Sequence, residues 1–338
     1  MQRLMLILTA VLTVTSPALA GIRIVTPNQA YADIARAVGG DLVRVDAIMR
    51  GPENPHNVVP KPSHMMKLRR AKLFIHSGLD AEPWVPLLIK GARKQEFLPG
   101  QTGNVDVSRG IELKEIPKSG ELSRALGDIH VFGNPHYILD PLNGIIVAET
   151  ILHALKRVDP THAESYQRNF DAYATRLREA TRRLLRKIVP YRGTKVVIYH
   201  RAWPYFFDRF GLVKVAEVEP KPGITPGPRH LNDCIEKMKA ADAKLVVVET
   251  FSSKKNAAFV AEKVGGHAVV LALDVRALPQ CDTYLNMIEY NVDTLINAMR
   301  EIGIQPRLAA GGDTKPGDGA KQSETENESS VARSEPQN

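Results

Sequence analysis

Residues 159–190 read DPTHAESYQRNFDAYATRLREATRRLLRKIVP, and this stretch organises the rest of the chain. Asp159 suits a helix N-cap, Pro160 suits the first turn, and Pro190 ends the run. Apolar residues recur between them at steps of three and four, which predicts one helix with a narrow buried stripe: Tyr166, Phe170, Tyr173, Leu177, Ala180, Leu184 and Ile188. At 1.5 Å per residue, this helix would be roughly 40 Å long. A stiff connector of that length predicts two lobes with a cleft between them.

Short apolar runs of strand length alternate with helical patterns on both sides of this helix. The runs cover residues 22–25, 42–48, 73–76, 195–199, 213–218, 245–249 and 268–273. Such alternation favours parallel sheets covered by helices, with ligands bound beyond the carboxyl ends of the strands. We therefore expect an α/β fold of two lobes joined by one long rigid helix. The alternative is that residues 159–190 form an ordinary core helix with a solvated basic face.

The two ends of the chain differ from its middle. Residues 1–20 combine an arginine, an apolar core and small residues before Ala20, which predicts a cleaved secretory signal peptide. No cysteine follows that site, so we expect a soluble periplasmic protein without a lipid anchor. Residues 306–338 have almost nothing to bury, which predicts a disordered tail. The divisions expected between the ends are an N-terminal lobe at 21–158, the linking helix at 159–190 and a C-terminal lobe at 191–305.

Charge and cysteine content restrict the partners and the compartment. The chain has 338 residues and a formal net charge of +8. Its basic residues are scattered over the predicted helices and form no stripe with aromatic residues, so we expect no nucleic-acid partner. Cys234 and Cys281 are an even number in an oxidising compartment, and a disulfide between them is the default expectation.

Four side chains of metal-ligand type lie next to the ends of predicted strands or helices. His56 and His136 each follow an Asn-Pro pair in a loop, His200 ends the run 195–199, and Asp274 ends the run 268–273. Two donors therefore come from each predicted lobe, and the four can form one tetrahedral transition-metal site. Glu249 also ends a strand and is the main rival to Asp274.

The remaining histidines are weaker candidates. His130 lies in a polar loop, where a solvated side chain is the expected alternative to an auxiliary ligand, and His76 ends a strand that can line the cleft. The others fall on predicted helices or connections, where structural or exposed roles are expected: His64, His153, His162, His230 and His267.

The sequence around the four donors contains a series of specific motifs. PHNVVPKPS at 55–63 and SGLDAEPW at 77–84 accompany the first histidine, NPHYILDP at 134–141 the second and YHRAWPYF at 199–206 the third. EPKPGITP at 219–226 and VETFSS at 248–253 follow in the same order as in the family that the motifs suggest. Over residues 22–302 the chain thus resembles the zinc/manganese solute-binding proteins of metal ABC transporters.

This resemblance implies two lobes joined by a rigid helix and a binding protein instead of an enzyme. It implies capture of a divalent metal in the periplasm and delivery to an inner-membrane ABC permease, with a periplasmic metallochaperone as a further candidate partner. By position, the ligands would be His56, His136, His200 and Asp274. Three imidazoles with one carboxylate suit four-coordinate Zn²⁺, and Mn²⁺, which prefers oxygen donors, is the alternative. We expect a monomer.

The chain departs from the family pattern at two places. Residues 54 and 134 are Asn where the family usually has an acid nearby, which predicts the loss of a carboxylate behind the ligands. The loop at 101–133 holds only His130 and not the histidine-rich run of many zinc members, so a scavenging role for that loop is not expected.

Two other classes of protein stay open at this point. A periplasmic zinc hydrolase would need three protein ligands, an open water position and a general base. A helix-bridged receptor for an iron chelate or cobalamin would share the two-lobed plan, but its cleft should be lined by Arg and aromatic groups.

Overall fold

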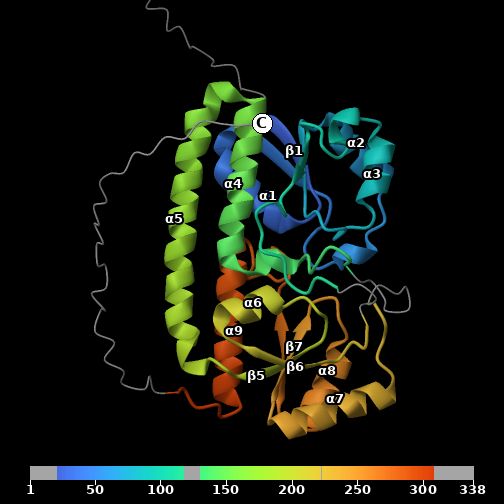
Figure 1. The fold of residues 1–338 in the computed structure, drawn as a ribbon, viewed down its shortest axis with the longest axis vertical. Coiled ribbons are helices and arrows are strands. Elements are labelled where there is room, and N and C mark those ends of the chain that lie inside the picture. The colour runs from blue at the N-terminus through green and yellow to red at the C-terminus, as the bar shows by residue number, and fades with distance from the viewer. Residues whose placement is uncertain (1–20, 118–129, 222, 308–338) are drawn as a thin grey trace, which may run out of the picture. The chain divides into compact units, whose positions relative to one another are not determined.

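Two parallel four-stranded sheets carry the fold in the computed structural model, which describes residues 21–117, 130–221 and 223–307 (Figure 1). The first sheet has the order β2-β1-β3-β4. Its strands are β1 (Ile22–Thr26), β2 (Val43–Ala47), β3 (Leu73–His76) and β4 (Asn104–Asp106), and its helices are α1 (Gln29–Gly39), α2 (Pro62–Arg70) and α3 (Val85–Ala92). In the register of β1, Ile22 lies opposite Val43 of β2 and Ile24 opposite Leu73 of β3.

The second sheet repeats this plan with the order β6-β5-β7-β8. Its strands are β5 (Lys195–Ile198), β6 (Val213–Glu217), β7 (Leu245–Glu249) and β8 (His267–Leu271), and its helices are α6 (Pro204–Phe210), α7 (Pro228–Ala241) and α8 (Lys254–Glu262). In each sheet the first strand is flanked by the second and the third, and the fourth is at the edge. The predicted α/β class with two parallel sheets is confirmed.

Short 3₁₀ helices mark most of the corners between these elements. They are η1 (Gly40–Leu42), η2 (Pro55–Asn57), η3 (Gln95–Phe97), η5 (His136–Leu139), η6 (Pro160–His162) and η7 (Val189–Tyr191).

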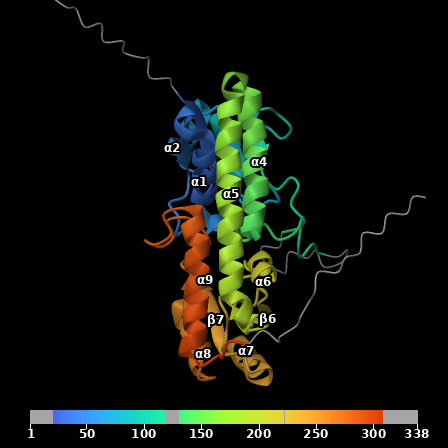
Figure 2. The same cartoon turned by 90° about the vertical axis from the view of Figure 1, so that its left-hand side faces the viewer.

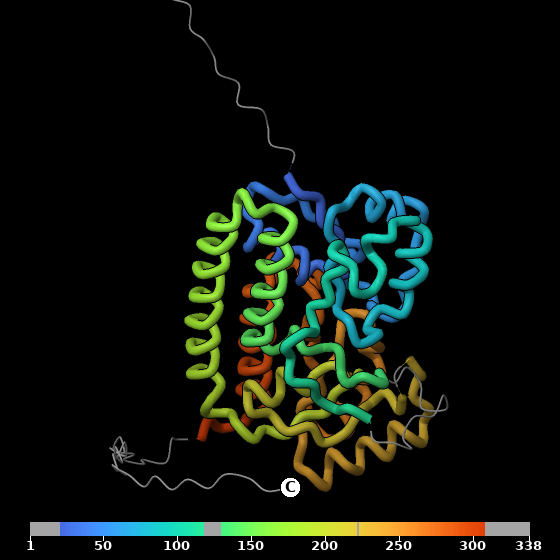
Figure 3. Tube along the Cα trace, turned by 45° about the horizontal axis from the view of Figure 1, so that its top comes forward, coloured from blue at the N-terminus to red at the C-terminus, as the bar shows by residue number. Residues whose placement is uncertain are grey.

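The long predicted helix is present as α5 (Ala163–Ile188), which packs antiparallel to α4 (Pro141–Val158). Figure 2 shows α5 beside α1 and α4 along one part of its length and beside α9 (Tyr284–Glu301) along another. One helix therefore packs against helices from both halves of the chain. Its stripe is buried as predicted, except that Phe170 is only partly buried. Figure 3 follows the chain from the blue first half through the green helices into the second half and back along the red α9.

Asp159 does not cap α5 as we expected. The chain first makes the 3₁₀ turn η6, and His162 occupies the N-cap position. The Asp159 carboxylate instead accepts a hydrogen bond from the Tyr166 hydroxyl at 2.7 Å and lies 2.7 Å from Nδ1 of His162. The residue therefore fastens the corner between α4 and α5.

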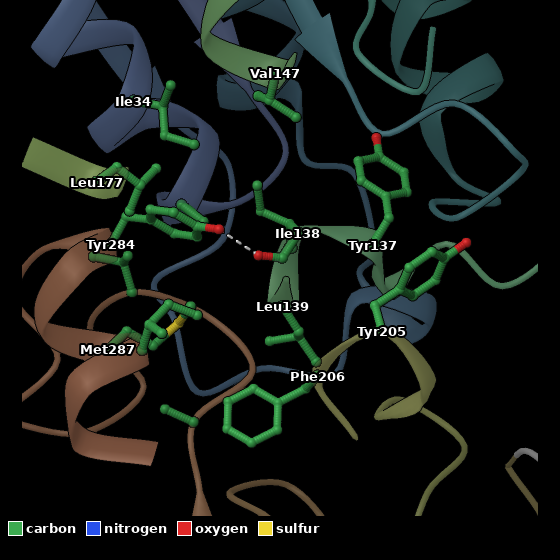
Figure 4. Close-up of a cluster of buried hydrophobic side chains, with 14 of the residues drawn as sticks. Ile34, Tyr137, Ile138, Leu139, Val147, Leu177, Tyr205, Phe206, Tyr284 and Met287 are labelled. Atoms are coloured by element: carbon green, nitrogen blue, oxygen red, sulfur yellow. Dashed lines mark hydrogen bonds between the residues drawn. The ribbon is translucent and has the colours of Figure 1, made fainter. Parts of the chain in front are cut away.

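The largest cluster of buried side chains extends over elements of both sheets. Figure 4 shows η5 at its centre, where the Tyr284 hydroxyl of α9 donates a hydrogen bond of 2.6 Å to the carbonyl of Ile138. Around η5 the figure places Ile34, Val147, Leu177, Tyr205, Phe206 and Met287. Contacts put the residues up to Pro306 into one compact unit, and the predicted lobe boundaries at 158 and 190 stay a prediction.

The expected disulfide is wrong. Cys234 and Cys281 are both free and buried. Strand residues 196, 198, 245 and 247 face the cluster that contains Cys281, whereas the alternate residues 197, 246 and 248 face the cluster that contains Cys234. Because successive side chains of a strand point to opposite faces, the second sheet itself separates the two thiols.

The predicted signal peptide and nearly all of the predicted tail lie outside the described residues. Within the described part of the chain, no helix is long and apolar enough to cross a membrane.

Candidate metal centre

Two of the predicted ligands lie in loops that are built in the same way. In the first loop the Asn54 side-chain oxygen accepts a hydrogen bond from the backbone N–H of His56 at 2.9 Å, and His56 lies in η2 after β2. In the second, Asn134 accepts from the backbone N–H of His136 at 3.0 Å, and His136 begins η5. The asparagines therefore fix both Asn-Pro-His loops by local side-chain to backbone bonds.

The third predicted ligand, His200, follows the end of β5 and meets the other two. The ring centroids of His56, His136 and His200 lie 5.9, 5.8 and 5.5 Å apart in the three pairs. One nitrogen from each ring lies within 4.8 Å of the other two, and no other trio of His, Cys, Asp or Glu in the described ranges comes this close. The structure thus brings together three of the four predicted donors.

The hydrogen bonds behind the rings decide which nitrogen faces the centre. Nδ1 of His56 lies 3.0 Å from the carbonyl of Ala81, Nδ1 of His136 lies 3.0 Å from Oδ1 of Asn134, and Nδ1 of His200 lies 2.6 Å from Oε2 of Glu219. Each of these oxygens only accepts, so each Nδ1 carries the proton when the ring is neutral. The lone pair is then on Nε2, which is the arrangement of a metal-binding histidine.

The orientation of the Asn134 amide is fixed by its other partners. Its NH₂ group donates to Oε2 of Glu115 at 2.9 Å and to the carbonyl of Arg201 at 2.8 Å. The oxygen must therefore face His136. A carboxylate thus stands behind His136 through one amide, so Glu115 partly replaces the carboxylate whose loss we predicted at position 134. Glu219 contacts His200 directly.

Burial disfavours a protonated imidazole at His136, whereas acidic neighbours favour one at His200. Nε2 of His136 and Nε2 of His200 are buried and have no hydrogen-bond partner among the described residues. Burial, helped by the neighbouring His200 and His56, lowers the pKa of His136 well below its ordinary value. Burial also opposes the charged form of His200, but the hydrogen bond to Glu219 and the Glu249 carboxylate raise its pKa above the ordinary value. Unpaired buried nitrogens are costly, and a bound ion would satisfy them.

Asp274, the predicted fourth ligand, lies in the same small cavity as His56 and His136, whose volume is about 50 Å³. It does not belong to the trio of nitrogens. Its Oδ2 accepts from the backbone N–H of Gln29 at 3.0 Å, and its Oδ1 accepts from those of Ala30 and Val275 at 2.8 Å each. Burial raises the pKa of Asp274 to about 7. The carboxylate therefore joins the end of β8 to the first turn of α1.

Glu249, the rival to Asp274, is fully buried and engaged elsewhere. It accepts hydrogen bonds from Nε1 of Trp203 at 2.6 Å and from the Ser252 hydroxyl at 2.9 Å. His76 is also engaged through both ring nitrogens, which contact Asn104 at 2.9 Å and the backbone N–H of Gly78 at 3.2 Å. Both side chains are thus held by other partners, and neither belongs to the trio of histidine nitrogens.

His130 is not the solvated residue that we expected. It is half-buried, and its ring centroid lies 4.9 Å from that of His56 and 6.2 Å from that of His136. Burial, with the neighbouring His56 and His200, lowers the pKa of His130 to about 3. The ring is thus kept neutral beside the trio. The sequence did not reveal this position, because the contact of His130 with His56 exists only in the folded chain.

The comparisons with known proteins agree with this geometry. The family model described as "Zinc-uptake complex component A periplasmic" matches residues 24–298. The chain belongs to the ZnuA family. Members of this family are metal-binding components of ABC transporters, and the resemblance found in the motifs is confirmed.

Relatives of this ZnuA-family chain are named for different metals. The iron-binding protein YfeA of Yersinia pestis is 27% identical over 284 residues, which cover 81% of this chain and 85% of that protein. The manganese-binding lipoprotein MntA of Halalkalibacterium halodurans is 26% identical, with coverages of 83% and 89%. Among solved structures, a crystal structure of ZnuA has a TM-score of 0.69 at 24% identity and covers 82% of this chain and 99% of that one. The structural likeness supports the fold alone.

Proposed function

We propose that this chain, as the metal-binding component of an ABC transporter, carries Zn²⁺ and delivers it to an inner-membrane permease. His56, His136 and His200 bind the ion through Nε2. The observation that carries the proposal is the set of Nδ1 hydrogen bonds, because they turn three buried lone pairs toward one point. Asp274 takes the fourth position if it gives up hydrogen bonds to α1.

The choice of zinc follows from the donors. Imidazole nitrogens suit Zn²⁺, whereas Mn²⁺ prefers oxygen ligands and higher coordination numbers. The relatives named for iron and manganese make Mn²⁺ and Fe²⁺ the competitors to test. Copper would bind these nitrogens tightly in a test tube, so selection against it in the cell rests on geometry and supply.

The two alternative classes have no observation in their favour. A cavity of about 50 Å³ between His56, His136 and Asp274 is far smaller than the several hundred Å³ that an organic chelate needs. The hydrolase reading requires a positioned water and a free general base, and the nearby Glu249 is already held by Trp203 and Ser252.

The proposed location is the periplasm, reached through the predicted signal peptide. Several relatives are named lipoproteins, including MntA of Halalkalibacterium halodurans, so the absence of a lipid anchor is a separate proposal for this chain. Its two cysteines are at 234 and 281, and neither lies near residue 20. The mass of the purified mature protein decides, since a lipidated chain would be heavier than residues 21–338.

The function is tested by chelator competition with the apoprotein. Loss of a residue that hydrogen-bonds to a metal ligand weakens metal binding by about 10- to 100-fold. His136→Ala should weaken zinc binding by more than this, because it removes a ligand itself. His153→Ala, on the exposed face of α4, is the matched control and should bind zinc like the unaltered chain. Equal zinc affinity in His136→Ala and the control would refute the site.

A further inference from the structure

A second cavity shares no lining residue with the cavity of the metal centre. Its volume is about 400 Å³, which falls in the range of roughly 300–1,000 Å³ that is typical of small-molecule pockets. Tyr31 of α1 lines the metal cavity, whereas position 33 lines the second one, about 200° further around the helix. The two cavities therefore lie on opposite sides of α1. The lining of the second includes Asp33, Arg36 and Ala37 of α1, Tyr173 and Arg176 of α5, and Leu285 of α9.

Two guanidinium groups at this second cavity lack an anionic partner among the described residues. Nη2 of Arg36 donates a hydrogen bond of 2.8 Å to the carbonyl of Val45. Arg176 makes no hydrogen bond or ion pair with a described residue. Burial, and next the positive charge of Arg276, lower the pKa of Arg36, although Asp33 favours the charged form. A bound anion would stabilise the Arg36 charge, because the carboxylates already nearby do not offset burial and repulsion.

Asp33 does not neutralise these guanidinium groups. Its Oδ2 accepts a hydrogen bond of 2.9 Å from the backbone N–H of Tyr284, at the start of α9, and burial raises its pKa. It forms no ion pair with any residue in the part of the chain that the structure describes. The residues that line the cavity thus supply two guanidinium groups and one carboxylate that is engaged elsewhere.

The same cavity has apolar walls and one further unpaired donor. Tyr173 is only 7% exposed, and its buried hydroxyl has no hydrogen-bond partner among the described residues. An unpaired buried hydroxyl is costly, and an oxygen atom of a ligand would satisfy it. Ala37, Leu177 and Leu285 supply apolar surface to the lining. A pocket of this kind suits a ligand with an apolar body and one polar group.

We propose that this cavity binds a small organic carboxylate, whose charged group accepts hydrogen bonds from Arg36 and Arg176 and whose apolar body lies against the aliphatic walls. The planar guanidinium group matches the two oxygens of a carboxylate. An organic cation would be repelled by both guanidinium groups, and an inorganic anion would leave the apolar walls in contact with water. The bound molecule would contact α1, α5 and α9 at once, and the site would be independent of the metal.

The test uses hexanoate as the probe, with the metal-free full mature chain and isothermal titration calorimetry. Hexanoate should bind at one site per chain, and hexylammonium, which has a similar length and the opposite charge, should not bind. Arg176→Gln should weaken hexanoate binding by about tenfold or more, as expected for the loss of a charge-assisted hydrogen bond. Arg178→Gln is the matched control, because Arg178 is exposed on the same helix and does not line the cavity.

Tyr173→Phe gives a second measurement that does not depend on removing a charge. It should weaken hexanoate binding, whereas the melting temperature without hexanoate should be unchanged or higher, because the variant removes an unpaired buried hydroxyl. A structural role alone would lower the melting temperature and leave hexanoate binding as it is, which would contradict the part assigned to Tyr173.

The remaining outcomes separate this cavity from the metal centre. His136→Ala should bind hexanoate like the unaltered chain. A loss of hexanoate binding in His136→Ala would place the carboxylate at the histidines and overturn the inference. Equal hexanoate affinity in Arg176→Gln and Arg178→Gln, or equal binding of hexanoate and hexylammonium, would also overturn it.

Discussion

Glu219 and His200 form the shortest of the three hydrogen bonds that orient the ligand rings, at 2.6 Å between Oε2 and Nδ1. The other carboxylate oxygen of Glu219 accepts from the backbone N–H of Gly223 at 2.8 Å, which holds the side chain in place. The three rings thus have three kinds of partner: a backbone carbonyl for His56, an amide for His136 and a carboxylate for His200. A carboxylate increases the basicity of the ring most, so His200 should be the strongest donor.

Replacing Glu219 by Gln should weaken zinc binding by about 10- to 100-fold, because the ring keeps an acceptor but loses its anionic partner. Glu219→Ala should weaken binding further, since the ring is then free to turn. Chelator competition on both variants measures this order. Glu236→Gln, at an exposed residue of α7 that pairs with Lys239, is the control. If Glu219→Gln bound zinc as tightly as the control, the Glu219 carboxylate would have no role in strengthening His200 as a ligand.

Zinc affinity should fall as the pH drops, and His200 should set where the fall begins. Imidazole must be neutral to bind zinc. Burial opposes protonation of His200, but Glu219 and Glu249 raise its pKa above the ordinary 6.5, whereas the pKa of His136 lies well below 6.5. His200 is therefore the first of these two to protonate, and the loss should start above pH 6.5.

The same titration on Glu219→Gln checks the assignment. Removing the anion that stabilises the protonated ring should move the onset of the loss to lower pH, even though the affinity at high pH is weaker. An onset at the same pH in both proteins would mean that another group controls the loss.

Glu82 should make the metal-free fold more stable at mildly acidic pH. Burial raises its pKa to about 7, and the Ser77 hydroxyl contacts it. An acid whose pKa is raised on folding contributes stability at low pH, and that contribution is lost as the pH rises from its unfolded value of 4.5 through about 7. Between pH 5 and pH 8 the unaltered apoprotein should lose on the order of 3 kcal/mol more free energy of unfolding than Glu82→Gln does, as measured by urea unfolding. The exposed Glu262→Gln serves as the control, and equal pH dependence in the two variants would contradict the prediction.

The two cysteines should be reduced in the mature protein. Unfolded, unreduced chain should give two titratable thiols, because the second sheet lies between Cys234 and Cys281. In the folded protein both should react slowly, since burial raises the pKa of each thiol to about 11. No titratable thiol before reduction would contradict the arrangement of the sheet.

Much of the fold could be predicted from the sequence because its signals are local. The bounds of β3 and β7 agree with the runs predicted at 73–76 and 245–249. Pro62 at the start of α2 and the continuous apolar run of β7 need no tertiary information. The three-residue strand β4, by contrast, has too few residues to show a pattern.

The site was predictable only as far as the ends of strands and helices, and the motifs around them, indicate it. His56, His136 and His200 follow from position, but their partners Ala81, Asn134 and Glu219 depend on which nitrogen each ring presents. The pairing of Cys234 with Cys281 failed because the count of cysteines does not tell which face of a sheet each occupies. Likewise, no sequence signal showed that folding places the His130 ring against His56.

Competition between zinc and manganese for the metal-free mature chain tests whether the three imidazoles select zinc. The apoprotein would be dialysed against equal concentrations of both ions, and bound metal would be counted by elemental analysis, beside His200→Glu. We expect one zinc per chain with almost no manganese, and a relative gain of manganese in His200→Glu, because an oxygen donor replaces a nitrogen. Manganese bound as well as zinc by the unaltered chain would contradict a zinc centre built from three imidazoles.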